Sequence, residues 1–118
     1  MQLSFIMVPT ISGTRQTVAH WREAGLEELW RPDGHTVLLG SADKAQVMVE
    51  DNSAEWDLGR GPVFVVDEVA ALEAPVHGWS IEPTTVTVGG YAAGVVHGCP
   101  VRYMDLTRCP GDKRELFG

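Results

Sequence analysis

Hydrophobic and polar positions in the first half of the chain follow a strand-like period that one helical stretch interrupts. Residues 3–8 (LSFIMV) alternate with the period of two expected of a strand. Residues 12–26 have helical spacing, with Ser12 or Thr14 as candidate N-cap and Gly25 as a C-terminal stop. Further strands are predicted at 27–30, 35–40 and 45–51, separated by turns at 32–34 and 41–44.

The stretch 61–81 (GPVFVVDEVAALEAPVHGWSI) changes its period in the middle. Its residues 62–66 have the pattern of a buried strand, and Asp67 is a natural N-cap for a helix that Pro75 must keep short. A hairpin turn is predicted at Gly89-Gly90. Strands are predicted at 80–88, 91–98 and 101–108. The second half therefore repeats the order of the first, which is one strand, one helix and three strands.

These two βαβββ modules predict a single α+β domain. We expect module one at about 2–51, a connecting loop at 52–60, module two at about 61–108 and a C-terminal tail at 109–118, within one domain over 1–118. Placed side by side, the modules would form curved mixed sheets around a concave cleft, with the helices outside. Such a cleft is the default binding site. Pairing within one chain and exchange between two chains both remain open, and the tail is expected to be mobile or to lie on an interface.

The paired modules resemble the vicinal oxygen chelate superfamily, which includes glyoxalase I, extradiol dioxygenases, fosfomycin-modifying enzymes and bleomycin-binding resistance proteins. The resemblance rests on GPVFVVDEVAAL at 61–72 and GVVHGCPVRYMDL at 94–106, and it covers about residues 2–107. The second stretch resembles the frequent ending F.DP.GN..EL of that superfamily, with Asp105-Leu106 in place of Glu-Leu.

In metal-dependent members of this superfamily, the ligands come from the first and last strands of each module. The resemblance places Ser4, Met48, Gly61 or Pro62, and Asp105 at those positions. Serine and methionine are poor ligands for hard or borderline ions, Gly and Pro offer no donor side chain, and a metal needs several well-placed ligands. A slipped register would supply Gln2, Gln46 and Asp105, still without a fourth ligand. We therefore expect no metal and no other cofactor.

Strand alternation predicts which side chains face the cleft. They are Ser4, Ile6, Val8, Gln46, Met48, Glu50, Tyr103, Asp105 and Thr107. Two tryptophans, one at a strand end and one in the connecting loop, are candidates to cover it. The predicted ligand-binding residues are Ser4, Trp30, Gln46, Met48, Glu50, Trp56, Tyr103 and Asp105. Glu50 and Asp105 would act as acceptors and Tyr103 as a stacking surface, while catalytic residues stay unassigned. The alternative is that water and cross-strand hydrogen bonds satisfy these polar groups.

Composition narrows the choice of partners. With 44% hydrophobic and 21% charged residues, the chain is typical of a globular domain. A net charge of −7 argues against nucleic acid and would suit a cationic ligand. No apolar run approaches the ~20 residues that span a bilayer, and no basic stretch precedes the first apolar residues, so we expect a cytoplasmic protein without membrane contact. Cys99 and Cys109 fit no metal-binding spacing and are expected to be reduced.

Together, these features predict a homodimeric protein that binds a small organic ligand, aromatic or cationic, in its cleft. The resemblance is closest to the metal-free bleomycin-resistance-like binders. One alternative is an enzyme, either a metal-dependent lyase or dioxygenase with a degenerate metal site or a metal-free isomerase. Another is an interaction protein whose cleft is vestigial and filled by side chains.

Overall fold

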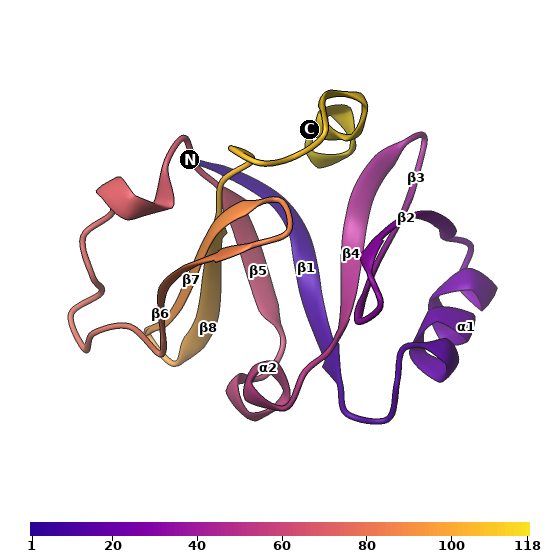
Figure 1. Cartoon of the computed structure of the whole chain (residues 1–118). Helices are drawn as coiled ribbons and strands as arrows, with labels where there is room; N and C mark the ends of the chain where they lie inside the picture. Colours follow the sequence, from indigo (N-terminus) through magenta and orange to yellow (C-terminus); the bar gives the residue numbers. More distant parts are fainter.

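The computed structural model describes residues 1–118, whose eight strands form one mixed and strongly curled sheet (Figure 1). The strands are β1 (Gln2–Thr10), β2 (Glu27–Asp33), β3 (Thr36–Ser41), β4 (Lys44–Asp51), β5 (Gly61–Val65), β6 (Ile81–Val86), β7 (Gly89–Val96) and β8 (Cys99–Met104). Their order across the sheet is β2-β3-β4-β1-β5-β8-β7-β6. β1 pairs in parallel with β4, β5 pairs in parallel with β8, and β1 and β5 are antiparallel at the centre. The two halves therefore repeat one pairing pattern and join within the chain.

The curled mixed sheet with few helices agrees with the expected α+β class. The strands follow the predicted pattern closely, and the turn predicted at 41–44 is present, with Ala42 and Asp43 at φ 51° and 59°. The turn predicted at Gly89-Gly90 is wrong, because the chain turns at Thr87-Val88 and both glycines belong to β7. A Cβ added at Gly90 would collide with the carboxylate that β7 packs against. These glycines permit that close approach rather than a turn.

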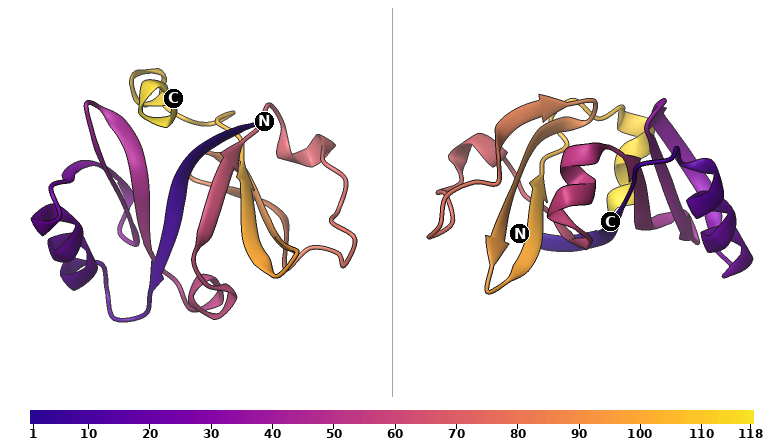
Figure 2. Two further views of the ribbon diagram at one scale, coloured as in Figure 1. Left: turned by 180° about the vertical axis from the view of Figure 1, so that it is seen from behind. Right: turned by 90° about the horizontal axis from the view of Figure 1, so that it is seen from below.

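On the outer face of the first half lies helix α1 (Arg15–Glu23), which follows β1 as predicted (Figure 2). Val18 is its buried residue, and Gly25 ends it at φ 105°. Five buried side chains form the core between α1 and the sheet: Val18, Val37, Leu39, Val47 and Val49. The helix is thus held by apolar packing, as its amphipathic pattern predicts.

The second half has no equivalent helix, so the helix predicted after Asp67 is wrong. Only one 3₁₀ turn, η1 (Val69–Ala71), forms, and an extended segment returns to β6. The buried N–H of Val69 donates to a side-chain carboxylate of Asp105 instead of entering a helix. Pro75 then lies against β7, where a Cβ added at Gly94 would come within 2.7 Å of the proline ring.

Two short helical segments close the ends of the curled sheet, seen in the right-hand view of Figure 2. Helix α2 (Ser53–Leu58) lies in the segment predicted to be a loop, and Asn52 caps it by accepting a hydrogen bond from the Glu55 N–H at 3.1 Å. At the other end is η2 (Gly111–Phe117), which packs Phe117 into the main core. The tail therefore packs against the sheet, which contradicts a mobile end, the first of the two alternatives expected for it. None of the helices is long and apolar enough to cross a bilayer.

Candidate functional site

The concave face of the sheet contains a cavity of about 290 Å³. Both halves of the chain line it, and 10 of its 18 lining residues are hydrophobic. Five buried side chains form its apolar floor: Phe5, Met7, Met48, Val63 and Met104. Its size is at the lower end of known ligand pockets, about 300–1,000 Å³, so it suits a small ligand with an apolar body.

The curl of the sheet brings its two edges together at the mouth of this cavity. The Thr87 hydroxyl, in the β6–β7 turn, donates to Asp33 Oδ2 at the end of β2 over 3.2 Å. Both residues line the cavity and are exposed, as are Asn52 and Ala54 at the start of α2. The floor is therefore buried and apolar, while the rim is polar and open to solvent.

Among the carboxyl groups that line the cavity, Glu50, near the end of β4, accepts the fewest hydrogen bonds. Its Oε2 accepts a hydrogen bond from the buried Thr36 hydroxyl on β3, and its Oε1 has no partner in the chain. Burial raises the pKa of Glu50 to about 7, against the opposing effect of the Thr36 hydrogen bond. The negative charges of Asp33, Glu55 and Asp51 raise this pKa further. Glu50 can therefore hold or release a proton near neutral pH.

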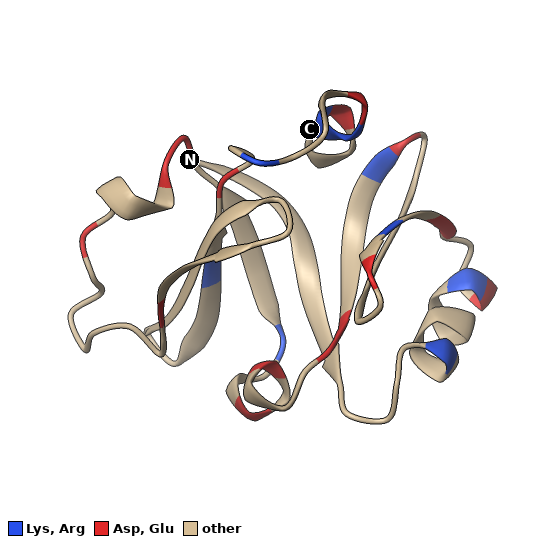
Figure 3. Ribbon diagram, viewed as in Figure 1, with Lys and Arg blue, Asp and Glu red and all other residues tan.

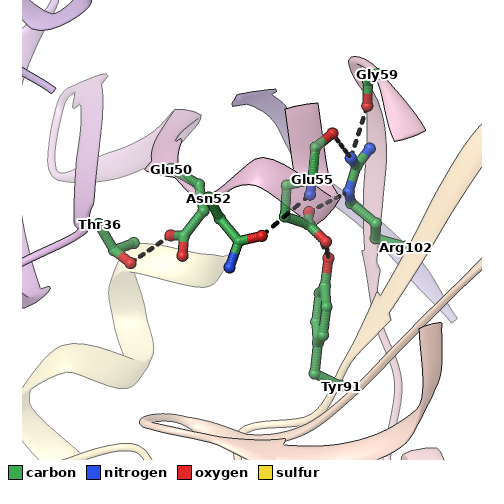
Figure 4. Close-up of polar contacts among 7 residues, drawn as sticks. All are labelled: Thr36, Glu50, Asn52, Glu55, Gly59, Tyr91 and Arg102. Atoms are coloured by element: carbon green, nitrogen blue, oxygen red, sulfur yellow. Dashed lines mark hydrogen bonds and ion pairs between the residues drawn. The ribbon is translucent and has the colours of Figure 1, made fainter. Parts of the chain in front are cut away.

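A second acid at the same end of the cavity, Glu55, is fully paired (Figure 4). Arg102 Nε donates to Glu55 Oε2 at 2.8 Å, and both side chains are buried. The Tyr91 hydroxyl donates to both carboxylate oxygens at 2.8 Å, and burial is the main cause of the raised pKa of Tyr91. Arg102 Nη2 also donates to the carbonyl of Gly59 at 2.6 Å, whereas its Nη1 is buried without a partner. This network joins α2 to β7 and β8 and leaves no cation free to face the cavity.

The polar end of the cavity is consequently acidic. Figure 3 shows acidic positions, in red, on α2 and at the end of β4. The only buried basic residue is Arg102. No Lys or Arg lines the cavity. A ligand entering here meets negative charge at one end and methionine, valine and phenylalanine side chains elsewhere.

Of the eight predicted ligand-binding residues, the structure brings Met48 and Glu50 together in the cavity lining. Ser4 donates to the Phe117 carbonyl at 3.0 Å, so the C-terminal segment covers it. Gln46 is exposed beyond the cavity, where its Oε1 accepts from Ser41 at 3.3 Å.

The two tryptophans and the two β8 candidates lie elsewhere. Trp30 packs edge-on against Phe117, with ring centroids 6.4 Å apart, and Trp56 is an exposed residue of α2. The assignment of Tyr103 to the cleft face is wrong, because its ring stacks on Phe64 on the outer face. The inward-facing residues of β8 are Arg102 and Met104.

Asp105 does not line the cavity, and its carboxylate holds neighbouring backbone segments together. Its carboxylate accepts from the backbone N–H groups of Val69 at 2.9 Å and Gly90 at 2.7 Å, and from the Thr107 hydroxyl at 2.7 Å. Burial alone would raise the pKa of Asp105, but these hydrogen bonds outweigh it and lower the pKa. This acid joins the crossover segment, β7 and the end of β8.

The inward face predicted for β1 is also wrong, and three residues of the site were not predicted. Phe5 and Met7 face the cavity, whereas Ile6 is exposed on the outside and Val8 packs toward α1. The missed residues are Glu55, Tyr91 and Arg102. The spacing of Asn52 and Glu55, typical of a helix N-terminus, is the signal that would have revealed α2 and hence Glu55.

The inward positions of the four central strands bear on the question of a metal. Apart from Glu50 on β4, they carry Met7, Met48, Val63 and Met104, and none of these four side chains is a ligand for a hard or borderline ion. The chain holds no group of three or more His, Cys, Asp or Glu side chains placed to share a metal ion. Both cysteines are free thiols, Cys99 exposed and Cys109 buried.

Comparison with protein-family models, curated proteins and solved structures finds no match to this chain.

Proposed function

We propose that this chain is a small-molecule-binding protein of the vicinal oxygen chelate type, which holds an organic ligand in its concave cavity without a catalytic metal. The observation that carries the proposal is the apolar cavity of about 290 Å³, to which both halves of the sheet contribute. A vestigial cleft would be filled by its own side chains. The cavity therefore favours a binding protein over an interaction protein.

The sheet topology supports the proposed relationship. Each half has its first strand beside its last, in parallel, and the first strands of the two halves pair at the centre. This is the arrangement expected of paired βαβββ modules around a cleft. The methionine and valine side chains at the inward strand positions support the metal-free branch. The same resemblance predicts a homodimer.

Thermal melting of the purified protein with a panel of small neutral aromatic and aliphatic compounds tests the proposal. A compound that binds the folded state and not the unfolded state raises the melting temperature as its concentration rises. We expect at least one such compound, and we expect Ala54→Trp to abolish its effect, because Ala54 is an exposed residue at the cavity mouth. Ala19→Trp, on the exposed side of α1 and away from the cavity, is the matched control. A panel without effect, or an effect that Ala54→Trp leaves intact, would contradict the proposal.

A metal-independent enzyme is the second candidate, and Glu50 is the observation that favours it. A carboxyl group with a pKa of about 7 in an apolar cavity has the property required of a general acid or base. In that case bound compounds would be converted, and Glu50→Gln would abolish turnover while preserving binding. If the ligand is recovered unchanged after long incubation, the enzyme candidate is contradicted and only the binding function remains.

A further inference from the structure

Beyond the size of the ligand, the cavity also indicates its charge. The candidates for a contact with a charged ligand group are the four titratable residues among its lining side chains: Asp33, Glu50, Glu55 and Tyr91. Asp33 Oδ1 accepts from the N–H of His35 at 2.8 Å and its Oδ2 accepts from Thr87, so both oxygens are engaged.

Glu55 and Tyr91 are engaged with each other and with the second half of the sheet. Glu55 accepts from Arg102 and from the Tyr91 hydroxyl, which has no second proton to donate. Glu50 Oε1 is therefore the acidic acceptor that remains free in the cavity. It lies on the same strand face as Met48, which belongs to the apolar floor.

The charges that act on Glu50 come from three elements and are all negative. They are Asp33 at the end of β2, Asp51 on its own strand and Glu55 on α2, and the nearest neutral donor is Thr36 on β3. The one buried cation of this region, Arg102, is paired with Glu55. A ligand that brings a positive charge would satisfy Glu50, whereas an anionic ligand would be repelled.

We propose that the cavity binds a small amphiphilic amine, whose apolar body lies on the methionine-rich floor and whose ammonium group donates a hydrogen bond to Glu50. This inference rests on the proposed binding function and assigns the chemical class of its ligand. The ammonium group would be the partner of Oε1, and a charge-assisted hydrogen bond at a partly buried site is among the stronger polar contacts.

Proton binding competes with this ligand. The pKa of Glu50, raised to about 7 by burial, places the change in charge between weakly acidic and weakly basic solution. Above that pKa the carboxylate attracts the amine, and below it the protonated carboxyl does not. Affinity for the amine should therefore fall as the pH is lowered, while affinity for a neutral analogue should not.

Calorimetric titration of the full chain with tryptamine, tryptophol and indoleacetate tests the inference, because the three share one aromatic body and differ in charge. At about pH 8.5 we expect tryptamine to bind about tenfold more tightly than tryptophol, and indoleacetate to bind most weakly. At about pH 5, where tryptamine keeps its charge and Glu50 is protonated, this preference should largely disappear.

The variant Glu50→Gln should show no preference for tryptamine at either pH, and its affinity for tryptophol should differ from that of the unmodified protein by less than about threefold. Glu82→Gln removes an exposed acid of β6 outside the cavity and should keep the preference. The pH dependence of the unmodified protein tests the same point if the variant does not fold.

Two contrary results are distinguishable. Equal binding of tryptamine and tryptophol, or binding of the neutral panel without tryptamine, would overturn the assigned ligand class and leave the binding function standing. Failure of all three indoles together with the neutral panel would overturn both.

Discussion

The two halves of the sheet pair their strands identically but hold the segment after their first strand in different ways. In the first half that segment is the nine-residue helix α1, which packs Val18 against a valine and leucine core. In the second half it is a single turn and an extended segment, fixed by Asp105 and by Pro75 against Gly94. One connection is therefore stabilised by apolar area and the other by a carboxylate that satisfies buried backbone groups.

The same difference extends to the cavity. The first half contributes Glu50, a carboxyl group with one free oxygen and a raised pKa. The second half contributes Arg102 and Tyr91, which pair with Glu55. We infer that the second half provides the rigid wall of the site, and the first half provides its reactive or binding group.

Of the substitutions that test this comparison, removal of Arg102 should lower the free energy of unfolding most. Arg102→Met leaves the buried Glu55 carboxylate without its cation, and loss of one partner of a buried pair costs about 3–5 kcal/mol in the free energy of unfolding. Urea unfolding measures it. The exposed pair of Arg31 and Glu28 is the control, since Arg31→Met should leave the stability nearly unchanged. Equal effects of the two variants would contradict the rigid-wall role.

Removing Asp105 should come next. Asp105→Ala leaves the N–H groups of Val69 and Gly90 without their acceptor, which should lower the free energy of unfolding by about 3 kcal/mol. Val18→Ala, the corresponding change beneath α1, should cost about 2 kcal/mol through lost apolar burial and a small cavity. Asp67→Ala, an exposed acid of the same crossover, should be nearly neutral.

The pH dependence of stability separates these two connections. Because the pKa of Asp105 is lowered in the folded state, its contribution is present above the unfolded value of about 3.9 and is lost as the pH falls through the lower folded value. Wild type and Asp105→Ala should therefore converge in stability under strongly acidic conditions. The penalty of Val18→Ala should not depend on pH in this way. A constant penalty for Asp105→Ala would contradict the account.

The contribution of Glu50 to stability should depend on pH in the opposite direction. Its pKa is raised on folding, so its contribution is present below the unfolded value of about 4.3 and is lost as the pH rises through about 7. Glu50→Gln should therefore stabilise the protein by about 2 kcal/mol at pH 8.5, allowing for the partial exposure of the group, and have little effect at pH 4. Urea unfolding of both proteins at the two pH values measures this. A stabilisation that is independent of pH would mean that burial of the charge is not its cause.

The smallest effect concerns the contact between the two sheet edges. Thr87→Val removes the exposed hydrogen bond to Asp33 and should cost about 0.5 kcal/mol or less. The substitution should change the rate of ligand dissociation more than this small loss of stability would suggest, because these two residues flank the mouth of the cavity. Stopped-flow measurement of the dissociation rate distinguishes the two effects, and an unchanged rate would show that the contact does not restrict exit.

Most strands and their order along the chain could be predicted from the sequence, because strong alternation and clear turn residues are local signals. The site could be predicted only in part. In β1 both faces are apolar, so alternation cannot decide whether Phe5 or Ile6 points inward, and the register also shifts between Leu3 and Phe5. In β8, a charged residue such as Arg102 favours an outward position.

What buries Arg102 is a partner 47 residues away on a helix that was expected to be a loop. The lost helix of the second half has a similar cause, since the acceptor for Val69 is Asp105, 36 residues later. Local sequence patterns cannot reveal contacts between residues that lie so far apart along the chain. In both cases a buried polar group is satisfied by a partner far along the chain.

The distribution of methionines allows the most direct test of the central claim that the concave cavity binds a small molecule. Met7, Met48 and Met104 line the cavity, whereas Met1 is 76% exposed at the chain terminus. Methyl NMR of methionine-labelled protein therefore provides three reporters and one internal control. On titration with tryptamine, the account predicts saturable shifts of the three cavity methyl signals and a stationary Met1 signal. Cavity signals that stay in place, while the neutral panel and tryptamine are raised to millimolar concentration, would contradict it.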